Sequence, residues 1–190
     1  RDRLFIGKGH IHLAMFNIWN DIGYIKDSVL KTYGKNGSIL GQQLNHMLPG
    51  SEYNTGSLGH VVGVGSGIAL SAKLDKKNYY TYALVGDAEC DEGSIWEAVM
   101  FAGNLRLDNL VVIVDRNKMS VMDYIQDDEN SGNLSKKFKS CGWSVISING
   151  HNFDQILKAF RLIKKNKKPT VIIANTIKGK GVSFMEKNIK

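Results

Sequence analysis

"YTYALVGDAECDEGSIWEAVMFAGNLRLDNLVVIVDRN", residues 80–117, carries the clearest structural signal in this chain. It begins with a short apolar run at 80–86, continues with a helical pattern over 93–106, and ends with a second apolar run at 109–115. Short apolar runs rich in β-branched residues are typical of buried strands. A strand, a helix and another strand in succession predict two parallel strands joined by a crossover helix.

The same alternation continues toward the C-terminus. Apolar runs at 143–148 and 170–176 are further strand candidates, and helical patterns cover 134–141 and 152–165. We therefore predict an α/β fold with a parallel central sheet and helices on both faces. Since no internal repeat or low-complexity linker divides the chain, we expect residues 1–190 to form a single domain, with trimming at either end left open.

The N-terminal part of the chain has weaker patterns. A strand-like run at 4–7 precedes expected helices over 12–24 and 26–34. Residues 34–57 have no clean period and are rich in Gly, Asn and Ser, which predicts a long ordered loop of the kind that often binds ligands. Residues 58–77 predict a buried helix. Its small residues would allow close packing against a neighbour, and we expect this of Gly63, Gly67 and Ala69.

Composition excludes several classes of protein. The formal net charge is +7, but the lysines lie mostly at predicted helix ends and loops, so we expect solvated faces and no nucleic-acid partner. Cys90 and Cys141 form no CxxC motif, which favours a reducing compartment and a cytoplasmic location. The longest apolar stretch, 61–72, is broken by Gly and Ser and is too short to span a bilayer, so we expect no membrane association.

Four carboxylates follow the run 80–86 closely: Asp87, Glu89, Asp91 and Glu92. Like charges this close repel one another unless a cation or a proton offsets them. Asp87 ends one predicted strand and Asn117 follows the next, 30 residues later, so both should reach one crevice at the carboxyl ends of the strands. Their oxygens suit Mg²⁺ or Ca²⁺, which often take further ligands from phosphates. The backbone N–H groups of Ala88 and Glu89 would meet such phosphates.

Residues 86–119 resemble the thiamine diphosphate motif, in which GDG is followed at a distance by Asn. In detail the chain is similar to the N-terminal section of a transketolase. Three further motifs support this resemblance in the right order: "DRLFIGKGH" (2–10), "NTGSLGH" (54–60) and "NTIKGKGVSFME" (175–186). The resemblance implies a thiamine diphosphate-binding fold, with thiamine diphosphate and a divalent metal as cofactors.

The resemblance also implies roles for individual residues. Asp87, Asn117 and the backbone carbonyl of Met119 would hold the metal that bridges the cofactor's diphosphate. His10, in "KGH", would contact the sugar substrate. The residues implied at the cofactor are Gly56, Leu58, Gly86, Asp87, Ala88, Glu89, Asn117 and Lys178.

Glu92 and Glu97 match acidic residues that link the two active sites of a transketolase dimer through a hydrogen-bonded network. For Glu97 a solvated helix position stays open, and for Lys178 an exposed glycine-rich turn stays open. Ala88 stands where the family motif has its second Gly, and His60 stands where Gln is common. Further departures, "HIHL" (10–13) and "GQQLNH" (41–46), fall where the sugar would enter, so the resemblance does not specify the sugar.

By this resemblance the chain is the diphosphate-binding subunit of an enzyme that moves a ketol group from a ketose donor to an aldose acceptor. The glutamate and the aromatic residues that serve the aminopyrimidine ring are expected on a separate C-terminal pyrimidine-binding subunit, joined to a homodimer of this chain. Alternatives in the same fold are a 2-oxoacid decarboxylase or dehydrogenase component and an enzyme of the deoxyxylulose-phosphate synthase type. A non-catalytic anion-binding module is an alternative from another class.

Overall fold

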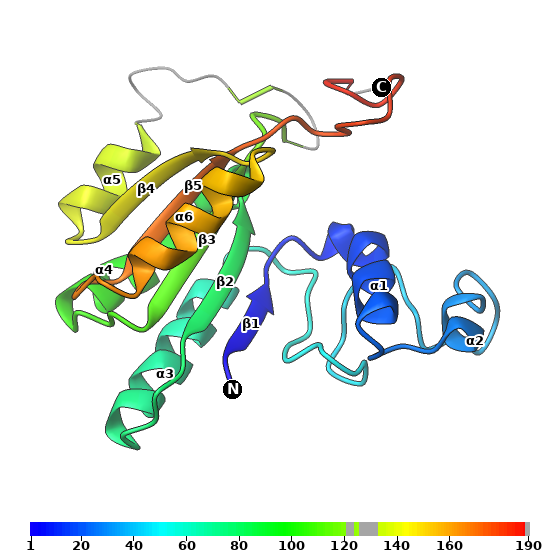
Figure 1. The fold of residues 1–190 in the computed structure, drawn as a ribbon, viewed down its shortest axis with the longest axis horizontal. Helices are drawn as coiled ribbons and strands as arrows, with labels where there is room; N and C mark the ends of the chain where they lie inside the picture. The colour runs from blue at the N-terminus through cyan, green and yellow to red at the C-terminus, as the bar shows by residue number, and fades with distance from the viewer. Residues whose placement is uncertain (121–123, 126–132, 189–190) are drawn as a thin grey trace.

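A computed structural model describes residues 1–120, 124–125 and 133–188 of the chain. The described strands form one parallel sheet in the order β1-β2-β3-β5-β4 (Figure 1). Their bounds are Arg3–Ile6 for β1, Thr81–Gly86 for β2, Leu110–Arg116 for β3, Ser144–Asn149 for β4 and Thr170–Asn175 for β5. The predicted parallel sheet is confirmed.

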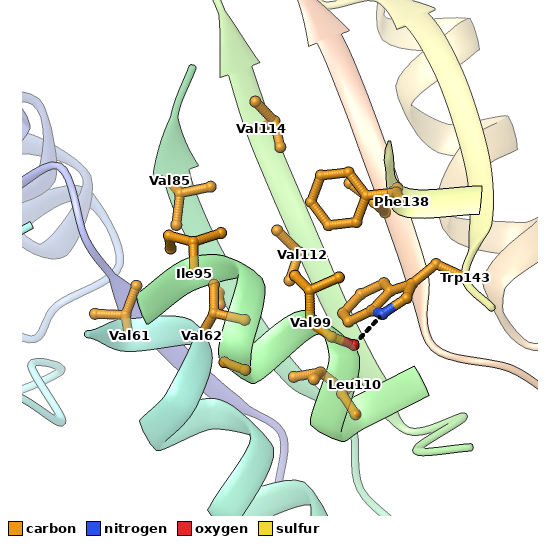
Figure 2. Close-up of a cluster of buried hydrophobic side chains, with 14 of the residues drawn as sticks. Val61, Val62, Val85, Ile95, Val99, Leu110, Val112, Val114, Phe138 and Trp143 are labelled. Atoms are coloured by element: carbon orange, nitrogen blue, oxygen red, sulfur yellow. Dashed lines mark hydrogen bonds between the residues drawn. The ribbon is translucent and has the colours of Figure 1, made fainter. Parts of the chain in front are cut away.

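One face of the sheet is covered by α3 (Val61–Leu74), α4 (Gly93–Asn104) and α5 (Leu134–Ser140). Figure 2 shows their apolar side chains packed against the valines of β2 and β3. Trp143 closes the end of this core, and its indole Nε1–H donates to the Val99 carbonyl at 2.8 Å. A buried indole N–H needs such a partner, so this bond ties the segment after α5 to α4.

The opposite face is covered by α6 (Phe153–Ile163), which lies in front of the strands in Figure 1. Its apolar side packs on the central strands, where Ile163 and Ile172 are each 1% exposed. The Asn152 side chain caps the helix by accepting from Gln155 N–H at 3.0 Å. Helices therefore cover both faces of the sheet, as predicted.

The N-terminal region lies beside the edge strand β1 and contains the 3-10 helix η1 (Gly9–Ile11), α1 (His12–Asp21) and α2 (Asp27–Leu30) (Figure 1). The predicted helix over 12–24 ends early, because Gly23 adopts φ +81° and terminates it. The predicted helix over 26–34 is a single turn. Thr32 there donates its hydroxyl to the Val29 carbonyl at 2.6 Å, a side-chain bond that competes with helix continuation.

The long loop predicted at 34–57 is irregular and anchored by its own apolar side chains. Leu40, Leu44 and Leu48 are 4%, 2% and 2% exposed and form a separate core with Phe16 and Trp19 of α1. This core fixes the loop beside β1.

The predicted close-packing face of α3 is wrong in one respect. A Cβ placed on Gly67 would meet nothing within 4 Å, whereas one on Gly65 would lie 3.4 Å from Leu110 Cδ1. Gly65, rather than Gly67, is the small residue that faces the sheet, because the two positions lie on opposite sides of the helix. Within the described ranges, no helix combines the length and the apolar character needed to cross a membrane.

Candidate functional site

The candidate site lies where the carboxyl ends of β1, β2, β3 and β5 meet. Gly86 pairs with Asp115 across β2 and β3, and Asp115 pairs with Ala174 across β3 and β5, so these strands end at the same level. Polar residues follow each strand at this edge, including Lys8 after β1 and Thr176 after β5. This is the edge at which open parallel sheets bind ligands.

Asp87 begins the turn after β2 and is 6% exposed. Its Oδ1 accepts from Ala88 N–H at 2.9 Å, and its Oδ2 accepts from Lys118 N–H at 2.6 Å. Burial raises the pKa of Asp87, and these two backbone bonds oppose that rise. The bond to Lys118 N–H joins the end of β2 to the turn after β3, so Asp87 and Asn117 are brought to one crevice, as their spacing predicted.

The turn after β3 presents two further oxygen atoms. Asn117 Oδ1 accepts from Met119 N–H at 3.0 Å, and Lys118 between them has φ +60°. Asn117 Nδ2 donates to Asp115 Oδ2 at 3.1 Å, which fixes the orientation of the amide. A tight turn of this kind places the Asn117 side chain and the Met119 backbone near Asp87.

The chemistry of these atoms fits a hard divalent cation. A carboxylate, an amide oxygen and a backbone carbonyl are the donor types that Mg²⁺ and Ca²⁺ prefer. Among the described residues, no group of three or more His, Cys, Asp or Glu side chains could hold a metal. A cation at this edge would therefore depend on the mixed oxygen set of Asp87, Asn117 and Met119.

A buried ion pair beside this turn was not predicted from the sequence. Lys8, which is 5% exposed, forms an ion pair with Asp115 Oδ2, and Thr176 donates its hydroxyl to Asp115 Oδ1. Burial acts to raise the pKa of Asp115, but the charge and hydrogen bond of Lys8 outweigh it and lower that pKa. The pair links β1, β3 and β5 at the floor of the site. Its only sequence signal was a Lys within "GKGH" and an Asp at the end of a strand.

The four carboxylates after β2 do not act as one cluster. Glu89 is 2% exposed, and its two oxygens accept from Gly59 N–H at 3.0 Å and Gly86 N–H at 3.2 Å. Its side chain is thus partnered by backbone groups, while Asp91 and Glu92 are exposed. Burial raises the pKa of Glu89, and the two backbone bonds oppose that rise. The sequence pattern could not show this, because Gly59 is distant along the chain.

His10 lies on η1, directly after β1. Its surroundings partly desolvate the imidazole, and this desolvation, followed by the charges of Lys8 and Lys178, lowers its pKa. A lowered pKa keeps the ring neutral at neutral pH. The influence of Lys178 places the segment after β5 on the same side of the molecule as His10.

His151 contributes a contact that the sequence did not reveal. Its Nε2 accepts from Ile177 N–H at 2.8 Å, which joins the turn after β4 to the residue before Lys178. Lys178 itself is exposed on the glycine-rich segment predicted from the sequence. The imidazole therefore helps to hold the backbone that carries Lys178.

Two predicted groups lie on the loop before α3 and on α4. Gly56, with φ +129°, and Leu58, 38% exposed, lie on that loop, and His60 contacts Ser57 within it at 3.1 Å. Glu92 and Glu97 are both exposed, Glu92 as the N-terminal cap residue of α4 and Glu97 within that helix. Both glutamates are thus accessible on the surface of this chain.

Comparison with known proteins adds a family to this geometry. The family described as "Transketolase, thiamine diphosphate binding domain" matches residues 1–189. One of the two subunits of the apulose-4-phosphate transketolase of Phocaeicola vulgatus is 42% identical to this chain, over 98% of the chain and 66% of that protein. The 6-deoxy-6-sulfo-D-fructose transketolase subunit SqwG of a Clostridium species is 40% identical, over 98% of the chain and 68% of that protein.

A solved structure agrees with these relatives. The crystal structure of transketolase from Campylobacter jejuni matches with a TM-score of 0.93 and 32% identity, and the match covers 100% of this chain and 31% of that one. The chain thus spans about two thirds of the length of the two relatives named as subunits, 66% and 68%, and under a third of the longer enzyme.

Proposed function

Because this chain belongs to the transketolase family, matching its thiamine diphosphate-binding domain, we propose that it binds thiamine diphosphate through a divalent metal and takes part in ketol transfer from a ketose to an aldose. The observation that carries the proposal is the bond from Lys118 N–H to Asp87 Oδ2 at 2.6 Å. It holds the two oxygen-bearing turns together at the edge where parallel sheets bind ligands.

The metal is assigned to Asp87, the side chain of Asn117 and the carbonyl of Met119. Mg²⁺ is the preferred ion, because it commonly binds one or two protein oxygens and takes others from a ligand's phosphates; Ca²⁺ is the alternative. Since burial raises the pKa of Asp87, a cation beside this carboxylate would stabilise its charged form. Gly86, Ala88 and Glu89 would offer backbone to the diphosphate.

When bound, thiamine diphosphate supplies the carbanion chemistry of ketol transfer. The residues of this chain bind and orient. Gly56 and Leu58 would contact the cofactor from the loop before α3, and Lys178 would approach its diphosphate. His10, whose pKa is lowered, would present a neutral imidazole to a sugar hydroxyl.

A separate partner chain completes the proposal. Two relatives are named as transketolase subunits, which supports a two-chain enzyme and favours ketol transfer over the 2-oxoacid alternatives. We propose that two copies of this chain associate with a pyrimidine-binding chain, and that the exposed Glu92 and Glu97 face another chain in that assembly. The cytoplasm is the proposed location, because Cys90 and Cys141 are both free.

A thermal unfolding experiment tests the binding proposal. We expect Mg²⁺ with thiamine diphosphate to raise the melting temperature in proportion to the logarithm of cofactor concentration, because the ligand binds only the folded state. Excess chelator should remove the effect. RNA and DNA serve as controls for the positive net charge, and a shift with nucleic acid but none with the cofactor would sink the proposal.

A further inference from the structure

The peptide of Gly59 is held on both sides by side chains from the segment after β2. Gly59 N–H donates to Glu89 Oε1 at 3.0 Å, and the Gly59 carbonyl accepts from Ser94 Oγ at 3.0 Å. We call this arrangement, made of Glu89, Ser94 and Gly59, the Gly59 clamp. It joins the loop before α3 to the turn that carries Asp87.

The clamp is tightly packed. A Cβ on Gly59 would lie 2.5 Å from Ser94 Oγ and 2.8 Å from Glu92 Cβ, and the residue has φ +86°. On the other side, a Cβ on Gly7 would lie 2.1 Å from Glu89 Oε1. Glycine is therefore required at both positions by close approach, and at Gly59 by its backbone conformation as well.

Glu89 connects more than two segments. Its second oxygen accepts from Gly86 N–H at 3.2 Å, at the end of β2. A carboxylate that is 2% exposed loses its hydration, and only these backbone bonds replace it. The bonds therefore form as a set, and their geometry determines how the loop before α3 sits relative to Asp87.

We propose that Glu89 and Ser94 are positioning residues that hold segment 56–60 at a fixed place relative to Asp87. The inference rests on the proposed function, in which Asp87 lies on the metal side of the cofactor and Gly56 and Leu58 on its ring side. Residues 54–60 contain no helix or strand, so few other contacts order them. Holding the loop before the ligand arrives lowers the entropy lost on binding.

Two ligands distinguish the two sides of the cofactor site. Pyrophosphate with Mg²⁺ probes the metal side alone, because it lacks the rings of thiamine diphosphate. Ser94→Ala removes one bond to the loop without touching Gly86, so it should weaken thiamine diphosphate about fivefold and leave pyrophosphate affinity unchanged. Glu89→Gln places an amide N–H against a backbone N–H and should weaken thiamine diphosphate about tenfold or more.

The measurement is calorimetric titration of both ligands, in the presence of Mg²⁺, into the chain assembled with its pyrimidine-binding partner. Ser71→Ala, at an exposed serine of α3, is the matched control and should bind both ligands as wild type does. Wild-type thiamine diphosphate affinity in Ser94→Ala, or an equal loss for both ligands, would overturn the clamp even if Glu89→Gln fails to fold. If the unmodified protein binds neither ligand, the proposed function fails, and this inference with it.

Discussion

Asp87 is the residue on which the proposed metal site depends most. We expect Asp87→Asn to abolish Mg²⁺-dependent binding of thiamine diphosphate, because an amide cannot offset the charge of the cation. Since burial raises the pKa of Asp87, its charge does not favour folding, and the variant's stability without ligand should change by no more than about 1 kcal/mol. Titration calorimetry and urea unfolding measure the two effects. Asn117→Ala should behave alike, and Asp91→Asn, at an exposed carboxylate, is the control; wild-type affinity in Asp87→Asn would refute the metal assignment.

His10 gives a separate prediction at the same scale. Its pKa is lowered from the ordinary value of 6.5, so protonation is disfavoured in the folded protein and begins only at a lower pH. We expect kcat/KM for the sugar to stay constant down to a pH below 6.5 and then to fall, with the fall absent in His10→Ala. His10→Ala should lower sugar specificity and leave cofactor affinity intact. A variant that no longer bound thiamine diphosphate would move His10 from the substrate to the cofactor.

At the scale of elements, α4 must approach the segment after α5 very closely. A Cβ on Gly103 would lie 1.9 Å from the Cys141 carbonyl oxygen, which belongs to the backbone. We expect Gly103→Ala to lower the free energy of unfolding by about 2–3 kcal/mol, because α4 and its neighbour would have to separate. Separation would also strain the bond between Trp143 and Val99 in Figure 2. Denaturant unfolding measures the change.

Gly67→Ala in α3 is the matched control for that prediction. Nothing lies within 4 Å of a Cβ at Gly67, which is a helical and exposed position. Alanine is a better helix former than glycine, so we expect a gain of about 0.5–1 kcal/mol. Equal effects at both glycines would show that helix propensity, and not the close approach at Gly103, decides the outcome.

For the whole molecule, we expect this chain alone to bind cofactor and to show no ketol transfer. In the proposed assembly the residues that serve the aminopyrimidine ring belong to the partner chain, so the ring would be exposed to water without it. The assay combines the chain, Mg²⁺, thiamine diphosphate and a ketose and aldose pair, with and without the pyrimidine-binding protein. Robust transfer by this chain alone would contradict the two-chain proposal.

The parallel sheet and the meeting of Asp87 with Asn117 were predictable from the sequence. Both depend on patterns that are local along the chain: apolar runs mark the strands, helical periods mark the crossovers, and polar residues at the strand ends mark the site. Helix ends were less predictable. The short α2 reflects the Thr32 hydroxyl bond, which no hydrophobic pattern records.

What only the tertiary structure decided is which distant segments meet at the site. The Lys8–Asp115 pair joins residues 107 positions apart, and the Gly59–Glu89 bond joins residues 30 apart. Such contacts depend on the strand order β1-β2-β3-β5-β4, which places β1 beside β2 and β5 beside β3. The sequence by itself determined which residues stand at the ends of strands, because hydrophobic periodicity is a local property. The strand order determined which of those ends became neighbours, because it results from the packing of the whole chain.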